Sequence, residues 1–66
     1  MENLIGSKVI VSADNCPANW PNIGILTNVD DFGIYLRPDL SRFPNSHDVN
    51  MVIFPLHAIS SLSITD

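Results

Sequence analysis

The stretch GILTNVDDFGIYL, residues 24–36, decides the fold that we expect of this chain. Apolar and β-branched residues flank Asp30 and Asp31, two acidic residues of the kind that favours a turn. Gly33, just after them, permits a bulge or a close approach of two backbones. The stretch therefore predicts two strands, residues 23–29 and 32–37, joined by a tight polar turn.

A second stretch, VIFPLHAISSL over residues 52–62, has a similar layout. Residues 51–54 form an apolar run that predicts a strand. Because proline donates no backbone hydrogen bond, Pro55 should end that strand or lie at an exposed edge. Residues 56–58 fit a single helical turn. Residues 59–64 alternate with a period near two, which predicts another strand.

The rest of the chain adds one strand and two loops. Residues 8–12 are a β-branched run typical of a strand. Residues 16–22 and 38–50 are rich in proline and asparagine and predict loops. Nowhere does the spacing favour a long helix. Five short strands in a single domain, residues 1–66, predict an all-β fold: a small, strongly bent barrel of SH3-like or OB-like kind.

The composition indicates how so small a domain gains stability. A chain of 66 residues has a thin core. Its one cysteine excludes an internal disulfide, and one cysteine with two unevenly spaced histidines does not make a structural zinc site. Hydrophobic residues make up 45 % of the chain and charged residues 15 %. Oligomerisation is the supplement that remains.

Several classes of function lack any signal in the sequence. There is no apolar run long enough for a membrane helix, and residues 1–6 lack the features of a signal peptide, so we expect a cytoplasmic protein. No glycine-rich phosphate loop, metal-ligand spacing or serine-nucleophile motif is present. Cys16 has no histidine near it in sequence. We therefore expect no enzyme activity, cofactor, metal or small-molecule substrate.

The two stretches together resemble the two motifs of the Sm/LSm family, most closely its bacterial Hfq branch. That branch reads Phe-Asp-x-Phe at the first joint, where this chain has VDDF over residues 29–32. At the second joint it reads Tyr-Lys-His-Ala-Ile-Ser, where this chain has PLHAIS over residues 55–60. The likeness extends over residues 24–64. It implies an Sm-like barrel whose N-terminal helix is reduced or absent, assembled into a closed homomeric ring of about five to seven copies.

In such a ring the two joints face a pore, where single-stranded bases stack on aromatic side chains. The likeness implies that Phe32 and His57 form this site and that the partner is a short, uridine- or adenine-rich single-stranded RNA. Further candidates for RNA contact are Asp31, Arg37, Arg42 and Trp20. The subunit interface would lie on the two apolar strands at the edges, with candidates Val52, Ile53, Phe54, Ile59, Leu62 and Ile64.

Three departures from the Hfq pattern affect function more than fold. Leu56 stands where that branch has a lysine, Pro55 where it has a tyrosine, and Asp31 where it has a glutamine. The net charge of −4 also disfavours general binding along a phosphate backbone, which requires Lys and Arg. Two alternatives thus stay open: an acidic ring that acts as a structural or protein-interaction scaffold without RNA, and a monomeric SH3-like adaptor.

The aromatic and acidic candidates at the joints have structural alternatives. Phe32 can belong to the core, and His57 can use a ring nitrogen to hold its turn. Asp30 and Asp31 are more typical of a solvated turn, in which carboxylates accept hydrogen bonds from nearby backbone N–H groups.

The loop candidates have structural alternatives as well. Arg37 and Arg42 can pair with Asp39 or Asp48 on the surface. Trp20 can cover the open end of the barrel instead of binding a base, or it can grip a peptide in the adaptor alternative.

Overall fold

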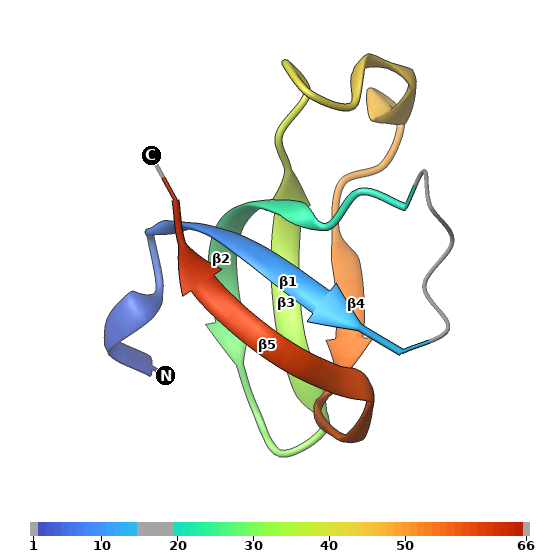
Figure 1. Cartoon of the computed structure of the whole chain (residues 1–66). Helices are drawn as coiled ribbons and strands as arrows, with labels where there is room; N and C mark the ends of the chain where they lie inside the picture. The colour runs from blue at the N-terminus through green and yellow to red at the C-terminus, as the bar shows by residue number, and fades with distance from the viewer. Residues whose placement is uncertain (1, 15–19, 66) are drawn as a thin grey trace.

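The computed structural model describes residues 2–14 and 20–65, which form one antiparallel sheet of five strands (Figure 1). Three short 3-10 turns, η1, η2 and η3, accompany the strands. In chain order the elements are η1 Glu2–Leu4, β1 Lys8–Ala13, β2 Ile23–Val29, β3 Gly33–Pro38, η2 Pro44–Ser46, β4 Val52–Pro55, η3 Leu56–Ala58 and β5 Ile59–Ile64. The all-β prediction is confirmed for the described residues.

The strands lie in the order β4-β3-β2-β1-β5, so β4 and β5 are the two edges of the sheet. Every neighbouring pair is antiparallel. The β2–β3 pairing shifts register between Leu26 and Asn28, and the β1–β5 pairing shifts between Ser12 and Ala13. Such bulges increase the local twist and bend the strand. No helix of the described residues is long and apolar enough to cross a membrane.

Most predicted bounds agree with the structure, and β2, η3 and β5 match at both ends. Before the first strand the described residues form one short 3-10 turn, η1. Five bounds were wrong, each by one residue. β1 ends at Ala13 rather than at residue 12, and β4 spans Val52–Pro55 rather than residues 51–54. β3 spans Gly33–Pro38 rather than residues 32–37. Phe32 belongs to the turn, which the backbone N–H of Asp30 closes by donating to the Gly33 carbonyl at 3.0 Å.

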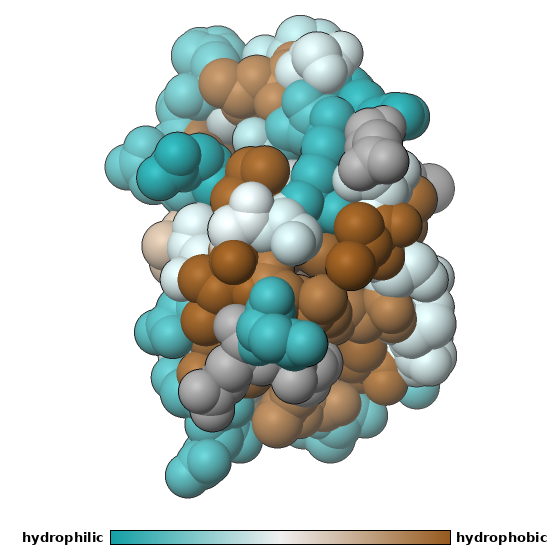
Figure 2. Space-filling view, turned by 90° about the vertical axis from the view of Figure 1, so that its left-hand side faces the viewer, coloured by the Kyte–Doolittle hydropathy of each residue, from teal (hydrophilic) through white to brown (hydrophobic). Residues whose placement is uncertain are grey.

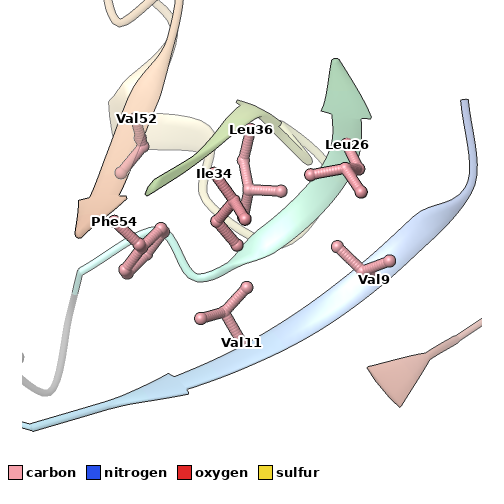
Figure 3. Close-up of a cluster of buried hydrophobic side chains, with 7 residues drawn as sticks. All are labelled: Val9, Val11, Leu26, Ile34, Leu36, Val52 and Phe54. Atoms are coloured by element: carbon pink, nitrogen blue, oxygen red, sulfur yellow. The ribbon is translucent and has the colours of Figure 1, made fainter. Parts of the chain in front are cut away.

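A single bent sheet encloses the core. Figure 1 shows β1 and β5 crossing in front of β3 and β4, and Figure 3 shows side chains from β1 to β4 converging on the space between them. The buried side chains of this core are Val9, Val11, Leu26, Ile34, Leu36, Val52 and Phe54. Because all of them lie on one face of the sheet, the sheet can bury them only by folding over on itself.

Two glycines allow this bend. A Cβ atom at Gly24 would lie 2.0 Å from the carbonyl oxygen of Arg37, and one at Gly33 would lie 2.1 Å from that of Phe54. Neither position can hold a side chain unless the neighbouring strand moves away. The backbones of β2, β3 and β4 therefore approach one another more closely than any other residue type permits.

Two leucines test this description of the core. Leu36 is fully buried, whereas Leu40 lies in the loop after β3 with 47 % of its surface exposed. We expect Leu36→Ala to lower the free energy of unfolding by about 2–5 kcal/mol, because it leaves a cavity. Leu40→Ala should change it by less than about 0.5 kcal/mol. Urea denaturation followed by circular dichroism measures both, and equal losses would contradict the assigned core.

Candidate functional site

The β2–β3 turn is built around Asp30. Its Oδ1 atom accepts hydrogen bonds from the backbone N–H groups of Phe32, at 2.9 Å, and Gly33, at 3.1 Å. This is the arrangement expected of a turn carboxylate, and it leaves Asp31 exposed. The same bonds set the backbone of Phe32 outside the sheet, so that its side chain is 58 % exposed. Phe32 is therefore not part of the core.

Asp30 also ties the turn to β3. The hydroxyl of Tyr35 donates to Asp30 Oδ2 at 2.6 Å. This bond, helped by the backbone bonds from Gly33 and Phe32, lowers the pKa of Asp30 below its ordinary value. The same bond raises the pKa of Tyr35, because the phenolate would lose it and would face the carboxylate. The turn thus holds a charged carboxylate in a fixed position.

The β4–β5 joint lies directly beside this turn. Gly33 pairs with Pro55, and the backbone N–H of Leu56 donates to the carbonyl of Phe32 at 2.9 Å. The β2–β3 turn and η3 accordingly occupy the same end of the sheet (Figure 1). Leu56 and His57, in η3, are both exposed. We call four exposed residues of these two joints, Asp31, Phe32, Leu56 and His57, the joint rim.

Backbone bonds fix the shape of η3. The N–H of Ile59 donates to the carbonyl of Leu56, and the N–H of Asp14 donates to the carbonyl of Ala58 at 2.8 Å. The second of these bonds attaches the joint to the end of β1. His57 therefore lies on a fixed turn. It directly follows Leu56, whose backbone N–H donates to the carbonyl of Phe32.

The remaining RNA candidates lie away from the joint rim. Arg37 is exposed near the end of β3, five residues beyond Phe32 and thus roughly 16 Å along the strand. Arg42 lies in the following loop, where its Nε atom is 3.7 Å from Asp39 Oδ2, so the predicted pairing with Asp39 is present. Trp20, just before β2, is 42 % exposed. The structure thus places the turn that carries Phe32 beside η3, which carries His57, and places Arg37 and Arg42 away from both.

The interface candidates divide between core and surface. Val52 and Phe54 face inward and are 4 % and 3 % exposed, so they are not available for contact with another copy. Between them Ile53 faces outward and is 48 % exposed. Side chains along a strand alternate between its two faces, so Ile53 points away from its two neighbours. Because residues 51–54 are all apolar, the sequence does not show which of the two faces is buried.

On β5, the side chains of Ile59 and Leu62 are partly buried against the core. Ile64 ends the strand and is 58 % exposed. The exposed apolar side chains of the two edge strands therefore come mainly from Ile53 and Ile64. Sequence reasoning missed Met51, which precedes β4 and is 47 % exposed.

Comparison with protein-family models, with curated proteins and with solved structures gives no match to this chain. Within residues 2–14 and 20–65, no group of three or more His, Cys, Asp or Glu side chains is placed to hold a metal ion.

The contact between Asp30 and Tyr35 can be tested by titration. Tyr35→Phe removes the largest cause of the lowered pKa of Asp30, so that pKa should rise toward its ordinary value. Because the pKa is lowered in the folded state, the bond stabilises the fold above the ordinary carboxyl pKa, and the stabilisation is lost as the pH falls. NMR titration of the Asp30 carboxyl carbon measures the change, and an unchanged pKa would contradict the bond.

Proposed function

We propose that this chain is an Sm-like barrel that assembles into a homomeric ring and binds short single-stranded RNA at the joint rim. The observation that carries the proposal is the 2.9 Å hydrogen bond from Leu56 N–H to the Phe32 carbonyl. It sets the two joints side by side with Phe32 and His57 exposed. An exposed aromatic ring and an exposed imidazole on adjacent segments are suited to stacking on unpaired bases.

The order of the strands supports assembly through the edges. β4 and β5 form the two opposite edges of the sheet, and within the described residues the outer backbone groups of each have no strand beside them. Pairing β4 of one copy with β5 of the next satisfies both sets of groups. This is a head-to-tail contact, which closes into a ring when the rotation between copies allows it. A ring of about five to seven copies follows from the Sm likeness.

Apolar side chains at the edges support the same assembly. Ile53 on β4 and Ile64 on β5 are both about half exposed. Figure 2 shows hydrophobic surface on the side of the molecule where η1 and the end of β5 lie. Ile5, which follows η1, is 44 % exposed. Burial of apolar surface between copies would stabilise a domain of this size beyond what its own core supplies.

The charges at the joint rim determine what kind of RNA contact is proposed. Asp31 is exposed there, and Leu56 replaces the lysine of the Hfq pattern. An acidic residue repels phosphate, so the rim must bind through bases rather than through the backbone. Stacking contributes about 1–3 kcal/mol per base, and repetition around a ring adds weak sites together.

A ring without RNA is the second candidate function. Leu56 is 38 % exposed and lies beside Phe32, so the rim also offers two neighbouring apolar side chains to a protein partner. The net charge of −4 favours this alternative, because it lowers the affinity for any polyanion.

Replacing Phe32 distinguishes the two candidates. We expect Phe32→Ala to weaken binding of a uridine oligomer by about tenfold or more, since it removes a stacking surface from every copy. The fold should persist because Phe32 is exposed. Fluorescence anisotropy measures the affinity, and Leu40→Ala is the control for loss of an exposed apolar residue. If Phe32→Ala binds the oligomer as tightly as the wild type does, the joint rim is not the binding site. If the wild type itself does not bind the oligomer, the scaffold without RNA is favoured.

The ring itself can be tested at β4. Ile53→Lys introduces a charge at the proposed contact, so native mass spectrometry should detect species smaller than those of the wild type. Leu40→Lys adds the same charge to a loop residue of equal exposure and should leave the assembly unchanged. If both variants keep the wild-type mass, the interface lies elsewhere, and a monomeric wild type would favour the SH3-like adaptor.

A further inference from the structure

The cations of this chain gather on one part of the sheet. Its three Lys and Arg residues are Lys8, Arg37 and Arg42. Lys8 pairs with Ile25, and Ile25 pairs in turn with Arg37, so these residues form one row across β1, β2 and β3. Residues paired across antiparallel strands project on the same face, which places the two cations roughly 10 Å apart.

This row lies on the outer face of the sheet. The next row consists of Val9, Gly24 and Pro38, all of which are buried. Because side chains alternate between the two faces of a strand, Lys8 and Arg37 point away from the core. Ile25, half-buried between them, supplies an apolar floor.

Asp39 brings the third cation to this row. Lys8 Nζ lies 2.7 Å from Asp39 Oδ2, and Arg42 Nε lies 3.7 Å from the same atom. The hydroxyl and the backbone N–H of Ser41 donate to the other carboxylate oxygen, at 2.7 and 3.1 Å. Asp39 also fixes the loop through its backbone, whose carbonyl accepts from the N–H groups of Arg42 and Phe43.

The carboxylate lies beneath the cations rather than beside them. Only 13 % of the Asp39 side chain is exposed, compared with 31 % for Lys8 and 54 % for Arg42. The bonds from Lys8 and Ser41 lower the pKa of Asp39 to about 2, so it stays ionised and keeps both cations in place. Among these four side chains the three cations outnumber the one carboxylate, on a chain whose net charge is −4.

We propose that Lys8, Arg37 and Arg42 form a phosphate-binding subsite for the backbone of a single-stranded RNA, separate from the joint rim. The inference rests on the proposed function, because it names the surface that would hold the phosphates of the same ligand. Guanidinium groups suit phosphate because they donate two parallel hydrogen bonds to its oxygens. Asp39 pre-positions Lys8 and Arg42, which reduces the entropy lost when phosphate binds.

The subsite explains how a chain with an acidic joint rim could still bind RNA. A rim that carries Asp31 cannot attract a polyanion, yet RNA binding depends on phosphate contacts for much of its affinity. With Arg37 roughly 16 Å from Phe32 along β3, base stacking and phosphate binding are assigned to different ends of one strand. An oligomer long enough to reach both ends should therefore bind more tightly than a dinucleotide.

NMR with two probes tests the subsite. Tripolyphosphate carries phosphates without bases, and a uridine oligomer carries both. In ¹⁵N-labelled protein we expect tripolyphosphate to shift the amide signals of residues 8, 37 and 42 and to leave those of residues 32 and 57 in place. Arg37→Gln should weaken the binding of both probes. The control is Ser12→Asp, which changes the charge by the same amount at an exposed position on the same outer face, roughly 13 Å from Lys8.

The salt dependence supplies a second readout. For the uridine oligomer, the slope of log K against log salt should fall in magnitude by about 0.7 for each phosphate contact that Arg37→Gln removes. Ser12→Asp should leave the slope unchanged.

The outcomes separate this inference from the proposed function. If the oligomer shifts residues 32 and 57 while Arg37→Gln behaves like Ser12→Asp, the subsite is wrong and the proposed function stands. If tripolyphosphate binds at residues 8, 37 and 42 but the oligomer binds nowhere, the RNA function is wrong and the cations bind phosphate of another source. If neither probe binds, both proposals are overturned.

Discussion

The close approach of backbones at two glycine–proline pairs is the constraint on which the rest of this structure depends. Gly24 pairs with Pro38 and Gly33 with Pro55, and in each case a side chain on the glycine would overlap a carbonyl oxygen of the opposite strand. With the strands this close, one sheet can bend far enough to bury side chains from its first four strands. A flatter sheet of the same sequence would expose that face to water and lose the hydrophobic contribution that stabilises so short a chain.

The approach at Gly33 also builds the candidate site. It draws the start of β3 against the end of β4, and the next hydrogen bond in that direction runs from Leu56 to Phe32. The backbone N–H of Phe32 donates to Asp30 Oδ1 in the turn beside this contact, and the Phe32 side chain is exposed. The joint rim is therefore a product of the bend, and a change that relaxed the bend would separate Phe32 from His57.

Local signals in the sequence were sufficient to predict which strands and turns are present. They were insufficient to predict which side chains those strands bury and which contacts join them. Asp30-Asp31, Pro55 and the alternation after it predicted β2, η3 and β5 at their observed bounds, because turns and strand ends depend on neighbouring residues. The inward positions of Val52 and Phe54 were missed, since a run of apolar residues does not reveal which face is buried. The bond between Tyr35 and Asp30 depends on the register of the β2–β3 hairpin, which a bulge displaces by one residue.

The two ends of β3 differ in the sign of the charged side chains around them. Asp30 and Asp31 precede the strand, and Arg37, with Lys8 and Arg42 around it, lies near its other end. A polyanion beside this strand is repelled at the turn and attracted at the far end. On the proposed function, phosphates would therefore lie toward Arg37 and bases toward Phe32. In a ring every copy would repeat this direction, so the assembly would orient a strand of RNA without requiring a net positive charge.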